Sequence, residues 1–312
     1  MPTIGRSGLE ALRLRGAFGK TDGWLATNGE TQASKTNIDS AYPQKSLLRL
    51  STRLGGGRSL VNNLFFTPPF KILSPFYEDY NEAFTLRKLK QQRTIITMIL
   101  VSAGIMAGDS QEIRLEVGGG CDVKLESQSF EKIHDMRGGH ARRDSFITVM
   151  PGAKLVYAPL PTIPFANSSF SNHTEVHLGS DSRLYYSDIF SCGRVGLNEL
   201  FAFRFYESRL KVFMQNRLIF LDNMILDPAA GGLSSLCFFK DFTHYLSLVI
   251  IDSDFDIDSF KSVLASMNSK NLITSISALP HGYCLRALAR GSEILIACLL
   301  YTSDAADDCW SV

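Results

Sequence analysis

Between residues 46 and 297, short runs alternate between apolar and polar positions, and turns rich in Gly, Pro or Asn separate these runs. Four turns have such a run on each side: 113–117 and 123–126, 146–149 and 155–157, 176–178 and 184–186, and 210–213 and 218–221. Side chains of a strand point alternately to opposite faces, so a period of two predicts strands with one buried face. Because each turn is short, we predict that the two runs beside it form a hairpin.

The four turns recur at a loose interval. They begin near residues 118, 150, 179 and 215, which is a spacing of roughly 30 residues. Such a repeat predicts a mainly β fold, a layered-hairpin or β-solenoid-like body in which neighbouring units bury each other's apolar faces. A β-sandwich stays open as an alternative, because periodicity alone does not distinguish the two architectures.

Helical spacing occurs only late in the chain, where we expect two short α-helices. Asp258 is a candidate N-cap for a helix over 259–267, in which Phe260, Val263, Leu264 and Met267 recur at helical spacing. A second short helix is predicted over 285–291, with Gly291 as its end.

Both ends of the chain differ from the middle. Residues 1–44 are rich in Gly, Ser, Thr, Asn and charge, which predicts a flexible extension or upstream sequence translated in error. Residues 298–312 break the preceding pattern, and the run from Cys298 to Asp307 matches, codon by codon, the translation of a transposon adapter from sequencing libraries. We therefore expect a folded domain over 45–297, with 298–312 as an artefact of sequence assembly.

Composition narrows the class of protein. The chain has 312 residues with 45% apolar and 20% charged residues and a net charge of +1, which indicates a globular protein and gives no nucleic-acid-binding footprint. No apolar run is long enough for a membrane span or a signal peptide. The six cysteines form no CxxC motif, so we expect buried, reduced thiols and a cytoplasmic location.

Enzyme motifs are sparse in this sequence. It has no GxxxxGK[ST] phosphate loop and no GxSxG elbow, which argues against nucleotide hydrolysis and esterase chemistry by this chain. One metal hypothesis remains, because His173, Glu175 and His177 alternate along one predicted strand and share a face. The alternative interpretation of these three residues is a solvated polar face.

Seven phrases of the sequence then fit one family together. They are Asn63–Lys71, Pro75–Tyr77, Ser102–Asp109, Ser127–His134, Pro159–Phe165, Gly193–Phe201 and Asp222–Pro228. In order and spacing, over about residues 46–295, they resemble the UreD family of urease accessory proteins, and most closely the form called UreH.

The resemblance implies a function in urease maturation without catalysis by the chain itself. It implies a scaffold that binds UreF, reaches UreG through UreF in a two-fold complex, and docks on the urease apoprotein. Nickel would be in transit and not tightly bound, and GTP would be bound by UreG. The competing hypothesis is a metal-dependent enzyme that uses His173, Glu175 and His177.

The resemblance also implies site residues. Residues of the nickel route or of partner contacts would be Asp109, Ser127, Gln128, Glu131, His134, Arg194 and Glu199. Gly104 and Gly108 would allow a tight chain path beside Asp109. Weakly held polar and carboxylate groups suit such a route, because a tight site would trap the ion.

Overall fold

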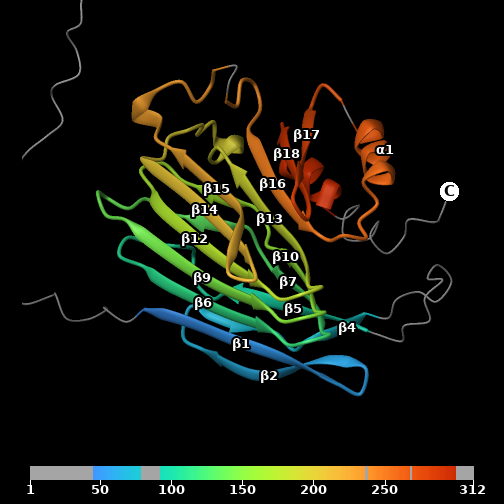
Figure 1. Cartoon of the computed structure of the whole chain (residues 1–312). Coiled ribbons are helices and arrows are strands. Elements are labelled where there is room, and N and C mark those ends of the chain that lie inside the picture. The colour runs from blue at the N-terminus through green and yellow to red at the C-terminus, as the bar shows by residue number, and fades with distance from the viewer. Residues whose placement is uncertain (1–44, 79–91, 236–237, 268, 300–312) are drawn as a thin grey trace, which may run out of the picture. The chain divides into compact units, whose positions relative to one another are not determined.

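Two β-sheets form the body of the protein, in a computed structural model that describes residues 45–78, 92–235, 238–267 and 269–299 (Figure 1). In spatial order, the seven-stranded sheet holds β15 (Arg217–Leu226), β14 (Phe205–Met214), β12 (Ser169–Leu178), β9 (Ala141–Val149), β6 (Ser110–Val117), β1 (Ser46–Gly55) and β2 (Arg58–Phe66). The main path of the eleven-stranded sheet holds β17 (Leu272–Leu279), β18 (Gly282–Ala289), β16 (His244–Ile251), β13 (Arg183–Ser191), β10 (Lys154–Ala158), β7 (Asp122–Ser127), β5 (Arg93–Leu100) and β3 (Phe70–Ile72). Three short strands lie beside this path: β4 (Phe76–Glu78), β8 (Glu131–Ile133) and β11 (Thr162–Pro164).

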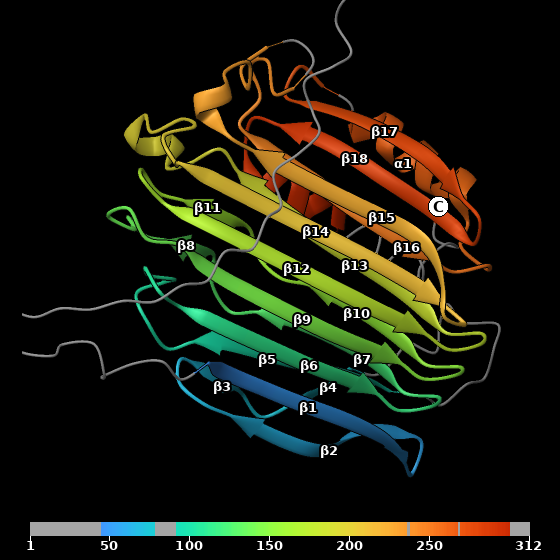
Figure 2. The ribbon, with the colours of Figure 1, turned by 60° about the vertical axis from the view of Figure 1, so that its left-hand side comes forward.

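The chain winds between the sheets as stacked coils. It passes from β6 to β7, from β9 to β10 and from β12 to β13, and each of these steps leads from the seven-stranded to the eleven-stranded sheet. Equivalent strands of successive coils are parallel neighbours (Figure 2). Ser110 pairs with Arg142 and Ala141 pairs with Phe170, so these two coils are 32 and 29 residues long. The predicted mainly β, solenoid-like fold is therefore confirmed.

The predicted hairpins are wrong for three of the four turns. The strands on either side of the turns at 118–121, 150–153 and 179–182 lie in different sheets and do not pair with each other. Only the turn at Gln215 and Asn216 closes a hairpin, which joins β14 to β15. Both residues have positive φ angles, 49° and 62°, as a two-residue hairpin turn requires. Alternation identifies the buried face of a strand but not its hydrogen-bond partner, so the pattern suits both arrangements.

Two apolar clusters fill the space between the sheets. One gathers core-facing residues beside the short turns, including Val117, Val149 and Leu184. The other lies toward the opposite end of the strands and includes Phe170, Phe190 and Tyr206. A third cluster covers the outer face of the eleven-stranded sheet and contains Phe260 and Leu264 of α1 (Ile257–Met267).

The structure corrects both helix predictions in detail. Helix α1 lies where it was expected, but Asp256 caps it instead of Asp258, because an Asp256 carboxylate oxygen accepts the backbone N–H groups of Asp258 and Ser259, each at 3.1 Å. The predicted helix over 285–291 is wrong, since most of this segment belongs to β18. The second helix covers 292–299 instead, so two helices near the C-terminal end are confirmed with the second one displaced. Two single-turn 3₁₀ helices also occur, η1 (Val195–Leu197) and η2 (Pro228–Ala230).

The expectations about the chain ends are largely outside the described residues. The predicted extension 1–44 and residues 300–312 of the predicted artefact are not described. Leu295 and Cys298 of the second helix are buried in the cluster on the outer face of the eleven-stranded sheet. Among the described residues, none of the helices has the length and apolar character needed to cross a membrane.

Candidate functional site

Parallel stacking brings the longer connections of the coils together at one end of the strands, which we call the loop end (Figure 2). It comprises residues 101–109, 128–140, 159–168, 192–204, 227–235 and 238–243. Backbone hydrogen bonds link successive connections, from Ile105 N to Lys132 O at 2.8 Å and from Phe165 N to Ile133 O at 2.8 Å. The opposite end, with the short turns, is the turn end. All nine residues predicted for the nickel route, the partner contacts and the tight chain path lie in or beside the loop end.

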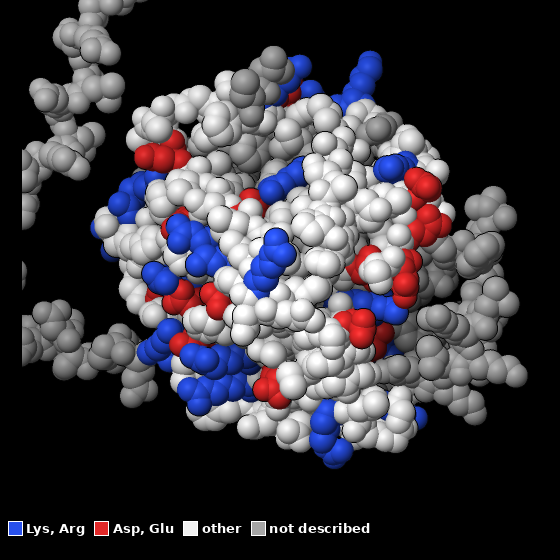
Figure 3. Space-filling model, in the orientation of Figure 1, with Lys and Arg blue, Asp and Glu red and all other residues white. Residues whose placement is uncertain are grey.

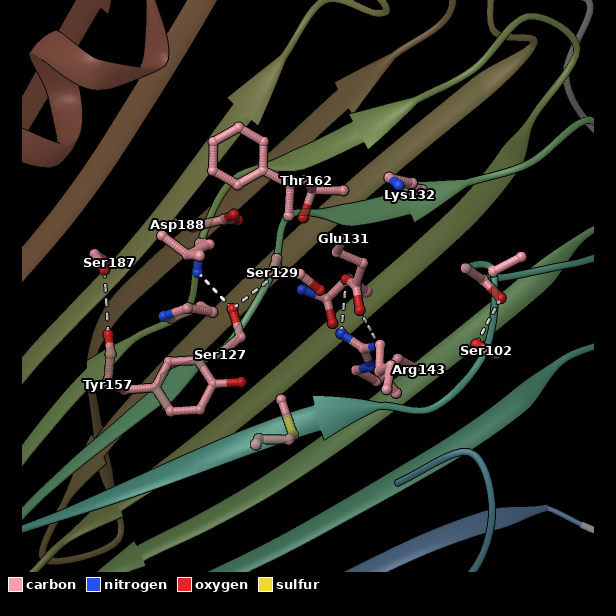
Figure 4. Close-up of a pocket in the computed structure, with 18 of the residues that line it drawn as sticks. Ser102, Ser127, Ser129, Glu131, Lys132, Arg143, Tyr157, Thr162, Ser187 and Asp188 are labelled. Atoms are coloured by element: carbon pink, nitrogen blue, oxygen red, sulfur yellow. Dashed lines mark hydrogen bonds and ion pairs between the residues drawn. The ribbon is translucent and has the colours of Figure 1, made fainter. Parts of the chain in front are cut away.

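A cavity of about 90 Å³ lies between the sheets near the loop end (Figure 4). Its walls include Ser127, Glu131, Arg143, Tyr157 and Asp188. The Arg143 guanidinium donates to both carboxylate oxygens of Glu131, with Nη1 at 2.8 Å from Oε2. These two side chains are only 7% and 13% exposed, so the cavity wall contains a nearly buried ion pair.

Arg143 is held on a second side by Gln111 of β6. Its Nε and Nη2 atoms donate to Gln111 Oε1 at 2.9 and 2.6 Å. Burial disfavours the charged guanidinium, but the attraction of Glu131 and the hydrogen bonds to it outweigh this effect and raise the pKa of Arg143. The arginine therefore stays positively charged inside the protein.

Asp188 of β13 is the next carboxylate along the interior. The Ser208 hydroxyl donates to its Oδ2 atom at 2.6 Å. Burial raises the pKa of Asp188, and the nearby charges of Asp222 and Glu131 act in the same direction. Beside it, the rings of Tyr157 and Tyr186 stack with centroids 4.9 Å apart, and burial raises the pKa of Tyr157 to about 12.

A second arginine pair lies farther along, between β15 and β18. Arg286 Nη1 is 2.8 Å from Asp222 Oδ2, and the Ser247 hydroxyl donates to the same oxygen at 3.2 Å. The Arg286 and Asp222 side chains are 36% and 19% exposed, so this pair reaches the solvent.

These groups form one continuous feature, which we call the polar layer. It consists of Gln111, Glu131, Arg143, Asn172, Asp188, Ser208, Asp222, Ser247 and Arg286. Most of the polar layer consists of two rows of residues that the pairing of neighbouring strands places side by side. The row on the seven-stranded sheet runs, from one strand to the next, through Gln111, Arg143, Asn172 and Ser208. Asp188, Ser247 and Arg286 are successive partners across the eleven-stranded sheet, and the hydrogen bond between Ser208 and Asp188 joins the rows. The polar layer separates the two apolar clusters and follows the direction in which the coils stack.

Three of the other predicted site residues, His134, Arg194 and Glu199, form a separate group on the loop end. His134 meets the Phe165 ring edge-on at 4.9 Å, and the Arg194 guanidinium lies 4.3 Å from the centre of the same ring. Arg194 is paired with Glu199, and the hydrogen bond from Arg194 lowers the pKa of Glu199. This group therefore connects three of the loop-end connections, 128–140, 159–168 and 192–204, through contacts with Phe165.

Asp109 and its neighbours shape the connection that precedes β6. Its carboxylate accepts the backbone N–H of Met106 at 2.9 Å, and Gly108 has a φ angle of 84°. A Cβ atom on Gly104 would lie 2.3 Å from the backbone oxygen of Lys132, so the two connections approach very closely there. Ser127 lines the cavity and accepts the N–H of Leu160 at 2.8 Å, while Gln128 is exposed nearby.

The alternative metal residues lie elsewhere, on the outer face of the seven-stranded sheet. His173, Glu175 and His177 share this face as predicted, but His173 Nε2 is 3.2 Å from Glu207 Oε2. His177 Nε2 is 2.7 Å from Glu175 Oε1, and no three His, Cys, Asp or Glu side chains of the described residues gather in a metal-binding arrangement. Figure 3 shows acidic and basic side chains interspersed on the face drawn in Figure 1, as on a solvated surface.

Most of the polar layer was missed by the sequence interpretation, although a signal was present. Arg143 has the same strand parity as Ala141, Ser145, Ile147 and Val149, all of which are buried. A charged residue at a core-facing position is rarely tolerated without a partner. A search for charged residues at the strand positions that otherwise carry apolar side chains would therefore have found Arg143.

Comparisons with known proteins give a consistent result. The family model described as UreD urease accessory protein matches residues 44–308. The urease accessory protein UreH of Helicobacter acinonychis (strain Sheeba) is 39% identical over 257 residues, which are 82% of this chain and 93% of that protein. UreH of Helicobacter hepaticus is 39% identical over 82% of this chain and 96% of its own length. The urease accessory protein UreD of Acetivibrio thermocellus is 36% identical over 81% of this chain and 94% of its own length.

Proposed function

Since this chain belongs to the UreD family of urease accessory proteins, we propose that it is a non-catalytic scaffold that delivers nickel to the urease apoprotein. In this proposal it binds UreF, reaches the GTP-binding protein UreG through UreF, and docks on apo-urease in the cytoplasm. The complex is two-fold through UreF, and nickel is the cargo, not a resident cofactor.

The polar layer is the observation that supports a nickel route most directly. It provides carboxylates, hydroxyls and amides through a largely apolar interior, from the cavity at Glu131 to the partly exposed pair of Asp222 and Arg286. Oxygen groups of this kind bind divalent cations, and partners that are already in place weaken their hold. A series of weak sites is what conduction of an ion requires.

The loop end is the surface that we assign to UreF. Its exposed apolar side chains include Val101, Met106, Phe130, Leu197 and Leu200, with Leu197 67% exposed and Val101 65% exposed. Several large apolar side chains on one end of a protein are typical of a protein–protein interface. This assignment also places UreF beside the cavity, where a cation passed on from UreG would enter.

The direct test is coexpression of the full chain with its cognate UreF, followed by size-exclusion chromatography. We expect a soluble, stoichiometric complex, and addition of UreG with GTP should enlarge it. A monodisperse chain that does not bind UreF and holds one metal ion tightly would contradict the scaffold function. That result would favour an enzyme that uses His173, Glu175 and His177.

A further inference from the structure

The polar layer contains positive charges, which a route for a nickel cation does not by itself require. Three carboxylates, on Glu131, Asp188 and Asp222, share the layer with two guanidinium groups, on Arg143 and Arg286. A fixed positive charge inside a route repels a divalent cation. The presence of an arginine at the cavity therefore needs its own explanation.

Arg143 occupies the oxygens that a cation would use. Both carboxylate oxygens of Glu131 accept its N–H groups, and Gln111 Oε1 accepts two more bonds. Its charge also acts on Asp188, which lines the same cavity. The Arg143 side chain thus hydrogen-bonds to, or offsets the charge of, most of the oxygen atoms here that could bind a cation.

Without the guanidinium, the cavity would present a set of oxygen ligands. Glu131 and Asp188, which both line the cavity, would supply two carboxylates. Asn172 also lines it, and its side-chain Oδ1 atom is buried with no hydrogen-bond partner among the described residues. Carboxylate and amide oxygens in a confined, low-dielectric space bind divalent cations strongly.

We propose that Arg143 prevents retention of divalent cations inside the protein, by keeping Glu131 and the adjoining oxygens from closing around the ion. This inference rests on the proposed nickel route. Arg143 acts as a positioning residue: it fixes Glu131 and sets the local charge, so that a cation passes the cavity instead of staying in it.

The test compares nickel retention by the full chain and its variants, with any polyhistidine tag removed. Wild-type protein, Arg143→Gln and Arg142→Gln are dialysed to equilibrium against Ni²⁺ alone, and bound nickel is measured by mass spectrometry. Arg142 is the matched control, because it is the neighbouring residue on the outer face, paired with Asp144 and 52% exposed. We expect Arg143→Gln to gain one site that binds Ni²⁺ at least tenfold more tightly than any site of the other two proteins.

Two further variants locate the gained site and test the charge. Arg143→Gln combined with Glu131→Gln should lose the site, and Arg143→Lys, which keeps the charge, should not gain it. Wild-type-like retention by Arg143→Gln, or a gain that persists in the double variant, would overturn the inference. Tight, stoichiometric retention by the wild-type chain would overturn it as well, whether or not the variants fold. Failure of the proposed function would appear separately, as a wild-type chain that neither binds UreF nor supports urease activation.

Discussion

Glu131 illustrates how one side chain links the predicted site to the interior. It was expected as a route residue, and it lies where the loop end meets the polar layer, in contact with Arg143. A nearly buried ion pair is weak evidence for stability, because removing two charges from water costs about as much as their attraction returns. The presence of this pair is therefore no argument for a stabilising role, which leaves room for the role proposed above for Arg143.

Gly104 gives a prediction at the same scale. A Cβ atom there would lie 2.3 Å from the backbone oxygen of Lys132, and the φ angle is 147°. Gly104→Ala should lower the free energy of unfolding by more than about 3 kcal/mol, because steric overlap adds to backbone strain. Urea-induced unfolding followed by circular dichroism measures this loss.

Gly108→Ala is the matched control. This glycine also has a positive φ angle, 84°, but no atom lies within 4 Å of the Cβ position. Its substitution should cost only the strain of the left-handed backbone, about 1 kcal/mol. Equal losses in the two variants would show that close contact with Lys132 does not constrain Gly104.

At the scale of elements, the sequence predicted strands well and their partners poorly. The alternating runs beside the turns at 118, 150 and 179 are strands, but each crosses to the other sheet instead of folding back on its neighbour. An amphipathic strand buries the same face in either case, and the choice depends on partners about 30 residues away, which local periodicity does not reveal. The helical assignment over 285–291 failed for a related reason, because a short apolar run fits a buried strand as well as a helix.

The start of α1 provides a prediction that separates the sequence interpretation from the structure. Asp256→Ala should lower the free energy of unfolding by about 1 kcal/mol, because its carboxylate accepts two N–H groups of the first turn. Asp258→Ala should cost no more than about 0.5 kcal/mol, since Asp258 is exposed and contributes only through the helix dipole and a weak ion pair with Lys261. Thermal unfolding of both variants checks the order, and a larger loss for Asp258→Ala would restore the original N-cap assignment.

At the scale of the whole described body, the two ends of the coils differ in character. The turn end holds the short turns 118–121, 150–153 and 179–182 beside an apolar cluster. The loop end holds the longer connections between these coils, and every predicted route or contact residue lies in or beside it. The resemblance to the UreD family located these loop-end residues from the sequence. It did not reveal the polar layer, because Gln111, Arg143, Asn172 and Ser208 become neighbours only through strand register.

A comparison between the two ends tests the assigned UreF surface. Leu197→Asp, at a residue 67% exposed on the loop end, should weaken UreF binding at least tenfold and leave the unfolding temperature unchanged. Leu218→Asp is the control, at a residue 45% exposed beside the turn end, and it should bind UreF like the wild-type chain. Binding is measured by surface plasmon resonance, and an effect confined to Leu218→Asp would place the interface at the opposite end.

The lengths of the coils bear on how this protein family can diversify. In the seven-stranded sheet, paired residues of β6 and β9 are 32 positions apart in the sequence, and those of β9 and β12 are 29 apart. In the eleven-stranded sheet, the pairs of β7 with β10 and of β10 with β13 show the same separations, 32 and 29. The turns 118–121, 150–153 and 179–182, which join the two sheets, are thus equal in length. The difference in length between these coils therefore arises entirely in the connections at the loop end. Changes in the length of these connections leave the strand register intact, so the loop end can vary while the interior stays constant.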